Sequence, residues 1–273
     1  MTSDGSARPD RDLHDDSRPA GPDDLAGVAG RFEQWQIEYA DALGSTNAAA
    51  AASPRAGRVV VTGHQTGGRG RMGRTWETPA GEALTFSAVV DPRLPDPDWP
   101  WVPLITGLCV VSALESLGVE ATLKWPNDVL VEGKKIAGIL IERVQGPHGP
   151  LAVIGIGLNV HQRELPVPAA TSLALCGVPT GRVEVLRLVL NRLATLRLFA
   201  AEHLDDYRHR YRAACATIGQ QVRVHLPDAS VHTGLAERVD DRGCLVVSDG
   251  DDELVVGAGD VVHVRPAHPH PSQ

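Results

Sequence analysis

Runs of alternating or continuous apolar residues predict strands through the first 160 residues of the chain. They cover 32–40, 58–65, 84–90, 121–125, 129–131, 135–144 and 151–160. The later runs are separated by turns too short for a crossover helix, so neighbouring strands should pair mainly antiparallel.

Helical spacing marks three further segments. Apolar residues occupy most faces of 103–117, as in a buried helix that ends at Gly118. The spacing in 182–203 predicts a surface helix packed on the sheet, with 207–214 as its extension after a break. An alanine run at 48–52 predicts a short helix that Ser45 or Thr46 would cap. The fold class is therefore α+β, with a mixed, mainly antiparallel sheet and helices packed on it.

The pattern changes at both ends of the chain. After Gly219, five short strands at 221–226, 231–239, 244–248, 253–256 and 261–265 indicate a small barrel. Residues 1–30 are rich in Asp, Pro, Gly and Arg, and they predict a disordered tail without an apolar face. We thus expect a tail at 1–30, a catalytic domain at 31–217, a small β domain at 218–266 and a frayed tail at 267–273.

Composition narrows the function classes. The chain has 273 residues, 42% of them apolar, and its net charge of −8 argues against general nucleic-acid binding. Its four cysteines are scattered singly, so they indicate neither a zinc site nor disulfides. No signal pattern opens the chain, and polar residues interrupt the longest apolar stretch, 104–119. These features predict a cytoplasmic protein without a membrane span.

The candidate chemistry is concentrated in residues 67–76, where glycine and arginine alternate before Trp76. Glycines let the backbone approach a ligand, and arginine forks pair with carboxylate or phosphate. Such a run indicates an anion clamp, although a solvated basic loop or a segment for single-stranded nucleic acid has the same composition. Trp76 is suited to stack on a base such as adenine. The alternative role for this residue is packing in the hydrophobic core.

A second stretch, 124–142, contains Lys-Trp-Pro-Asn-Asp and Lys-Ile-Ala-Gly-Ile-Leu, with Ser45-Thr46-Asn47 upstream and Gly-Ile-Gly-Leu-Asn at 155–159 downstream. Together these motifs resemble the biotin protein ligase family in order and spacing, from about residue 37 to residue 265. The resemblance implies a class II synthetase-like catalytic domain of the biotin/lipoate ligase type and an SH3-like C-terminal β-barrel.

The resemblance also implies a biotin site. Ser45, Thr46 and Asn47 would bond the ureido head, although the first two equally suit a helix cap. The family often has Asp before this Ser, and Gly44 replaces it here. The remaining biotin contacts implied by the family are Gln65, Arg69, Gly70, Arg71, Lys135 and Gly138.

Activating a carboxylate with ATP brings two anions together, so the site needs positive charge between them and a metal ion on the phosphates. The arginines at 69, 71 and 74 and Lys135 are placed there. Lys135 is assigned by its register in the family motif, and Lys134 is expected in solvent.

The family implies roles for the remaining residues. Trp76, Asn127 and Asn159 would contact the nucleotide, and Asp128 would orient or deprotonate the acceptor lysine. Ordinary turn chemistry is the alternative for the Asn-Asp pair, which follows a proline. The predicted catalytic residues are Lys135, Arg71 and Asp128.

The implied reaction converts biotin and ATP to biotinyl-AMP and pyrophosphate, after which a lysine on a biotin carboxyl carrier domain displaces AMP. Mg²⁺ would enter on the ATP phosphates, with no certain protein ligands. The alternatives are lipoate ligation, a biotin-sensing regulator and, more remotely, RNA binding by the arginine loop. The chain is expected to be a monomer or weak dimer that binds no DNA.

Overall fold

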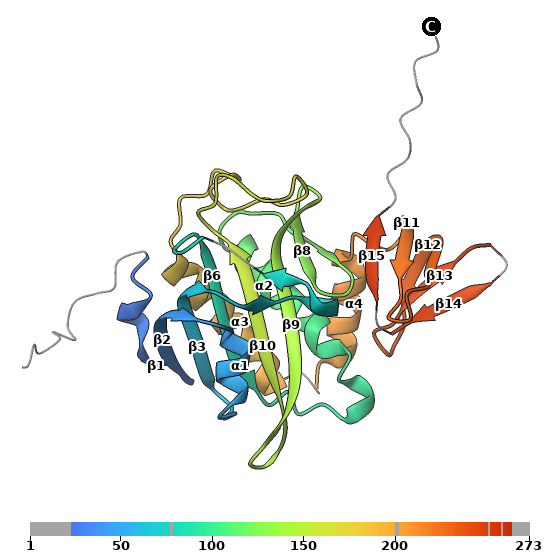
Figure 1. The fold of residues 1–273 in the computed structure, drawn as a ribbon. Coiled ribbons are helices and arrows are strands. Elements are labelled where there is room, and N and C mark those ends of the chain that lie inside the picture. Colours follow the sequence, from blue (N-terminus) through green and yellow to red (C-terminus); the bar gives the residue numbers. More distant parts are fainter. Residues whose placement is uncertain (1–22, 77–78, 200–201, 251, 258, 264–273) are drawn as a thin grey trace, which may run out of the picture.

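The structure is a computed structural model that describes residues 23–76, 79–199, 202–250, 252–257 and 259–263. An eight-stranded mixed sheet forms its centre, in the order β1-β2-β3-β6-β10-β9-β8-β7 (Figure 1). Its strands are β1 (Gly30–Phe32), β2 (Trp35–Leu43), β3 (Arg58–Gln65), β6 (Ala83–Val90), β7 (Thr122–Lys124), β8 (Asp128–Val131), β9 (Lys134–Gly146) and β10 (Gly149–Asn159).

All but one of the strand pairs are antiparallel; β2 and β3 run parallel. The sequence predicts a single strand at 32–40. The structure instead has the β1–β2 hairpin there, with a turn between Phe32 and Trp35 in which Glu33 has a φ of 51°. Every residue of β6 is buried, because helices cover both faces of the sheet at this strand. Mixed pairing and helical cover agree with the fold class that the sequence predicts.

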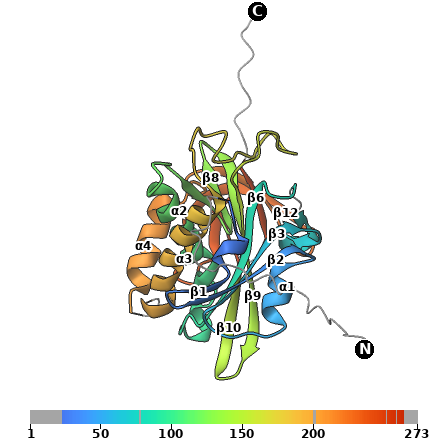
Figure 2. The same cartoon turned by 90° about the vertical axis from the view of Figure 1, so that its left-hand side faces the viewer.

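Four helices surround the sheet: α1 (Thr46–Ala51), α2 (Trp101–Glu115), α3 (Arg182–Phe199) and α4 (Leu204–Ala214). In the side view α2, α3 and α4 lie on one side of the sheet and α1 on the other (Figure 2). Beneath α1, Val60, Val89 and Val153 pack with Ala50 in a small apolar cluster. The larger core lies between the sheet and α2 and α3. None of the described helices is long and apolar enough to cross a membrane.

The N-terminal segment corrects the predicted tail. Residues 1–22 lie outside the described part of the chain, but Leu25 and Val28 are buried in the main core, within or beside the short 3₁₀ helix η1 (Ala26–Val28). The Asp23 carboxylate lies 2.6 Å from Nε2 of His161 and accepts the backbone N–H of Arg182 at 3.1 Å. Burial raises the pKa of Asp23, but these hydrogen bonds outweigh it and the pKa lies below its ordinary value. The prediction of a tail without an apolar face is therefore wrong for residues 23–30.

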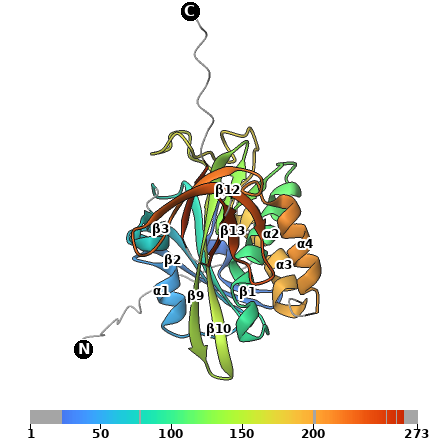
Figure 3. The same cartoon turned by 90° about the vertical axis from the view of Figure 1, so that its right-hand side faces the viewer.

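The C-terminal part is a five-stranded antiparallel sheet in the order β14-β13-β12-β11-β15 (Figure 1). Figure 3 views the molecule from the side of this sheet, with β12 and β13 in front of the larger sheet. Each predicted strand is present, and the bounds are β11 (Gln221–His225), β12 (Val231–Val239), β13 (Leu245–Ser248), β14 (Glu253–Val256) and β15 (Asp260–His263). The predicted frayed end at 267–273 lies outside the described residues.

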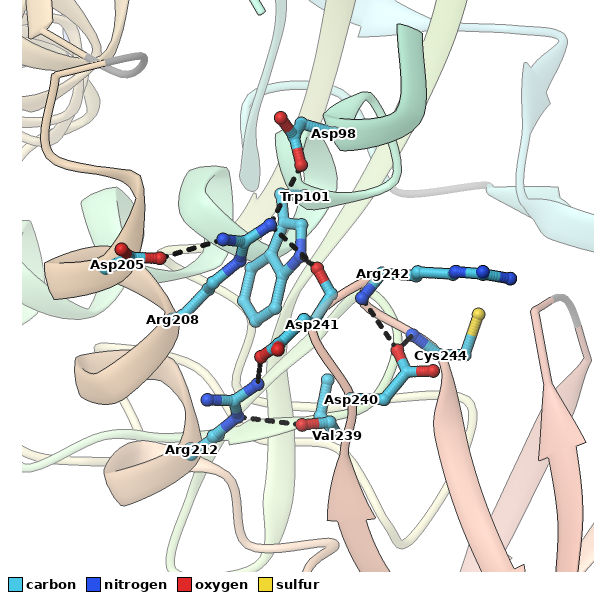
Figure 4. A network of polar contacts seen from close by, with 10 residues as sticks. All are labelled: Asp98, Trp101, Asp205, Arg208, Arg212, Val239, Asp240, Asp241, Arg242 and Cys244. Atoms are coloured by element: carbon cyan, nitrogen blue, oxygen red, sulfur yellow. Dashed lines mark hydrogen bonds and ion pairs between the residues drawn. The ribbon is translucent and has the colours of Figure 1, made fainter. Parts of the chain in front are cut away.

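The turn between β12 and β13 attaches this sheet to the larger domain (Figure 4). The indole N–H of Trp101 donates to the Asp241 carbonyl at 2.8 Å, and the Arg208 guanidinium donates to the same oxygen. Arg212 of α4 bonds the Asp241 carboxylate at 2.7 Å, which lowers the pKa of that carboxyl. Deeper in the interface, the buried Trp125 indole donates to the Gly243 carbonyl at 3.0 Å. These bonds satisfy the turn's carbonyls and hold the two domains together.

Candidate active site

One pocket combines the predicted motifs. It holds about 850 Å³ including its open mouth, and parts of β3, β6, β8, β9, β10 and the start of α1 line it. Every residue assigned from the sequence to biotin, nucleotide or catalysis lines this pocket except Asn159. Residues more than 200 positions apart in the chain, Ser45 and Asp260, therefore meet at one cavity.

Buried polar groups form one end of the pocket. Ser45 caps α1, because its hydroxyl accepts the Ala48 N–H, which confirms the capping alternative without removing Ser45 from the pocket wall. The Gln65 side-chain oxygen accepts the Thr46 N–H at 2.9 Å. Asn47 donates to the Leu140 carbonyl at 3.4 Å and is only 6% exposed. Such a set of fixed donors and acceptors suits a polar, uncharged ligand head.

The glycine-arginine run folds as a small hairpin that the sequence analysis did not anticipate. Its strands are β4 (Gly68–Arg69) and β5 (Thr75–Trp76), with the 3₁₀ turn η2 (Arg71–Gly73) between them. The Gly70 N–H donates to the Arg74 carbonyl at 2.6 Å and closes the turn. A Cβ at residue 68 would lie 2.2 Å from the Trp76 carbonyl, so only glycine fits there. The hairpin thus presents its arginines over the pocket.

Trp76 lies against the strands beneath the hairpin. A Cβ added at Gly157 would approach its indole to 2.4 Å, and one at Gly138 would lie 3.5 Å from the same ring. Gly157 therefore makes room for the indole, whereas the tight neighbour of a Cβ at Gly138 would be the Lys135 ammonium, at 3.0 Å. Lys135 places its ammonium 5.5 Å from the ring centroid, within cation–π range.

The two charged catalytic candidates on the sheet, Lys135 and Asp128, form an ion pair. The Lys135 ammonium lies 2.6 Å from Oδ1 of Asp128, and both side chains are partly buried in the pocket wall. The neighbouring Lys134 is exposed at the start of β9, as the register predicted. Backbone bonds to Ala169 and Thr171, both 2.8 Å long, hold the Lys135 peptide against the 161–181 loop. Lys135 is thereby fixed while its amine stays accessible from the pocket.

The arginines of the hairpin have different environments. Arg71 is the most enclosed; burial lowers the pKa of its guanidinium, and the charges of Asp128 and Asp260 oppose that shift. Among the described residues, no ion pair or hydrogen bond engages the Arg71 guanidinium, so its fork faces the pocket unused. Arg74 instead contacts Asp260 of β15 through both guanidinium nitrogens. Arg69 is exposed on β4 at the pocket rim.

The predicted nucleotide contact by Asn159 is not supported by its position. Its amide donates to the Thr171 carbonyl and accepts from Gln162, both at 2.9 Å, and the side chain is 4% exposed. The Thr171 peptide in turn bonds Lys135. Asn159 therefore lies outside the pocket lining. Through Thr171 it helps to hold the backbone of the strand that carries Lys135.

Three pocket features escaped the sequence analysis. Thr85 lines the cavity, and Ser87 lies directly behind its polar end, two residues further along β6. Asp260 brings the C-terminal sheet to the pocket. The only signal for the first two was polarity at alternate positions of an otherwise apolar strand, and nothing local marked Asp260.

The comparisons with known proteins agree with this geometry. Residues 41–159 match the Biotin/lipoate A/B protein ligase family, and residues 217–264 match the Biotin protein ligase C terminal domain. The biotin--[acetyl-CoA-carboxylase] ligase of Mycobacterium tuberculosis is 38% identical over 257 residues, covering 89% of this chain and 94% of that protein. The Bacillus subtilis bifunctional ligase/repressor BirA is 30% identical, over 75% of this chain and 66% of the relative.

Solved structures show the same fold. The Aquifex aeolicus biotin protein ligase in complex with biotin and ATP superposes with a TM-score of 0.73 at 27% identity, covering 84% of this chain and 99% of that chain. The pocket is of the kind that activates a carboxylic acid with a nucleotide for transfer to an amine. The chain belongs to the biotin protein ligase family.

Proposed function

We propose that the chain is an ATP-dependent biotin protein ligase that acts in two steps at this pocket. Biotin and ATP give biotinyl-5′-AMP and pyrophosphate, and a lysine of a biotin carboxyl carrier domain then displaces AMP. The observation that carries the proposal is a single cavity with a buried polar end at Thr46, Asn47 and Gln65 and a cationic end at Arg71 and Lys135.

In the first step a carboxylate oxygen of biotin attacks the α-phosphorus, and pyrophosphate leaves. Both reactants are anionic, so Lys135 and Arg71 offset their repulsion and the charge that develops on the phosphate. The biotin ring occupies the polar end, its carboxylate passes beside Gly138, and Arg69 and Gly70 cover it from the hairpin. Arg74, Trp76 and Asn127 are placed along the nucleotide.

In the second step the acceptor amine attacks the acyl carbon, and AMP leaves with the electrons of the broken bond. Asp128 is positioned to orient this amine and take its proton, since its carboxylate lies in the pocket wall beside Lys135. Among the described residues, no cluster of three or more His, Cys, Asp or Glu could hold a metal. We expect Mg²⁺ to enter with the ATP phosphates, whose oxygens are its usual ligands.

The partner proposed here is a carrier domain of an acyl-CoA carboxylase, with the enzyme acting in the cytoplasm as a monomer or weak dimer and without DNA. Support comes from the name of the Mycobacterium tuberculosis relative and from the free cysteines, which suit a reducing compartment.

The test is calorimetry with biotin and lipoate, followed by mass spectrometry of a carrier domain incubated with ATP and each acid. Biotin should bind and add one biotinyl group to the carrier. The polar end should reject lipoate by orders of magnitude, because its buried polar groups would then be unpaired. Comparable binding and transfer of lipoate would refute the proposed substrate.

A further inference from the structure

Ser87, on the central strand β6, touches two residues of the polar end without lining the pocket itself. Its hydroxyl lies 2.7 Å from Oγ1 of Thr46 and 2.6 Å from Oδ1 of Asn47. The Ser87 residue is 0% exposed, whereas Thr46 and Asn47 both reach the cavity. Ser87 can therefore act on a ligand only through these two side chains.

The orientation of Asn47 is fixed by its surroundings. Its amide nitrogen donates to the Leu140 carbonyl at 3.4 Å, so its oxygen points to Ser87 as an acceptor. A Cβ at Gly155 would lie only 2.2 Å from that oxygen, so glycine at 155 leaves the space that the amide occupies. Asn47 cannot supply a proton to this contact.

Proton counting then sets the direction of the remaining bonds. Ser87 has one hydroxyl proton to share between the Thr46 and Asn47 oxygens, and the Thr46 proton is taken up by the Gln65 oxygen or by Ser87. Gln65 already accepts the Thr46 N–H at 2.9 Å, and its contact with the Thr46 hydroxyl is longer, at 3.2 Å. Thr46 thus keeps only lone pairs for a ligand and can accept an N–H.

We infer that Ser87 is a specificity-determining positioning residue, which orients the Thr46 hydroxyl as an acceptor and so selects ligands with a ring N–H, such as a cyclic urea. The inference rests on the proposed function and adds a residue to it. Without Ser87, the Thr46 hydroxyl keeps only its longer contact with Gln65 to hold its orientation, and the Asn47 oxygen loses its donor.

The test measures biotin affinity by calorimetry, without ATP, for the parent chain, Ser87→Ala, Thr46→Val and the double variant. Each single substitution should weaken binding roughly 10- to 100-fold, the range for a buried hydrogen bond whose loss strands its partner. Because the two residues act as one unit, the double variant should be no more than about threefold weaker than the weaker single variant. The KM for biotin should rise in Ser87→Ala, while kcat at saturating biotin stays within about threefold.

Thr106→Ala is the matched control, because Thr106 is also 0% exposed and bonds one carbonyl, in α2, away from the pocket. It should lower the melting temperature and leave biotin affinity unchanged. If Ser87→Ala does not fold, Ser87→Cys provides the test, because a thiol fills the site but donates weakly. Unchanged affinity in the Ser87 variant, or effects that multiply in the double variant, would overturn the inference. Absence of biotin binding by the parent would instead refute the proposed function.

Discussion

Replacing Lys135 with Ala should slow adenylate formation by roughly 100- to 1000-fold, the range for one preorganised group removed from a developing charge. The structure gives this substitution a second cost. The Lys135 ammonium is 2.6 Å from the Asp128 carboxylate, so its removal leaves an unpaired negative charge in the wall that faces the phosphates. The loss should therefore lie toward the upper end of the range.

Two further variants separate these effects. Lys134→Ala removes the same charge one residue earlier, where the side chain is exposed, and should change the rate less than about twofold. Asp128→Asn in the Lys135→Ala background removes the stranded carboxylate and should recover part of the adenylation rate, although transfer to the carrier lysine stays slow. The free energy of unfolding should be similar in all variants.

Single-turnover release of pyrophosphate from biotin and ATP measures the first step alone. If Lys134→Ala and Lys135→Ala slow pyrophosphate release equally, the assignment of Lys135 rather than Lys134 to the active site is refuted. A double variant no faster than Lys135→Ala would refute the electrostatic role given to the pair.

Three other predictions concern the N-terminus, the hairpin and the domain contact. Deleting 1–30 should lower the free energy of unfolding by about 3 kcal/mol or more relative to deleting 1–22, because Leu25 and Val28 leave the core at about 1.5 to 3 kcal/mol each; equal denaturation midpoints would contradict their burial. Arg71→Gly should release the adenylate roughly 10- to 100-fold faster and biotinylate bystander proteins, with added free amine suppressing the labelling; unchanged retention would assign the clamp to another arginine. Asp260→Ala should raise the KM for ATP severalfold with biotin affinity unchanged, since it frees the Arg74 guanidinium; steady-state kinetics with an unchanged KM would show that the contact is dispensable.

Local patterns were sufficient for most of the fold and the pocket. Strand and helix periodicity placed the elements within a few residues, and the five C-terminal strands were all identified. Lys135 was distinguished from Lys134 because alternate residues of a strand face opposite sides, so the motif's register decides which amine enters the pocket. Most of the residues that line the pocket belong to short motifs, which a sequence displays directly.

The sequence analysis missed side-chain contacts whose partners are distant in sequence. Asn159 ends a buried strand, and its amide was assigned to the nucleotide because nothing local shows that Thr171 returns beside it. Leu25 and Val28 are isolated apolar residues in a polar segment. Their burial depends on anchors at His161 and Arg182, more than 130 residues away, which no periodicity reveals.

The contact between Arg74 and Asp260 also joins residues that are far apart in the sequence. It connects the C-terminal sheet with the hairpin at the pocket. Asp260 can meet the hairpin only if the C-terminal sheet holds a fixed position, and the β12–β13 turn supplies that position through Trp101 and Arg212. The turn thus bonds α2 and α4 (Figure 4), while Asp260 at the start of β15 lines the pocket. Weakening the turn should therefore affect the hairpin, although no residue of the turn lines the pocket. On this argument Arg212→Ala should reproduce the rise in the KM for ATP of Asp260→Ala in the folded enzyme, and the two effects should not add.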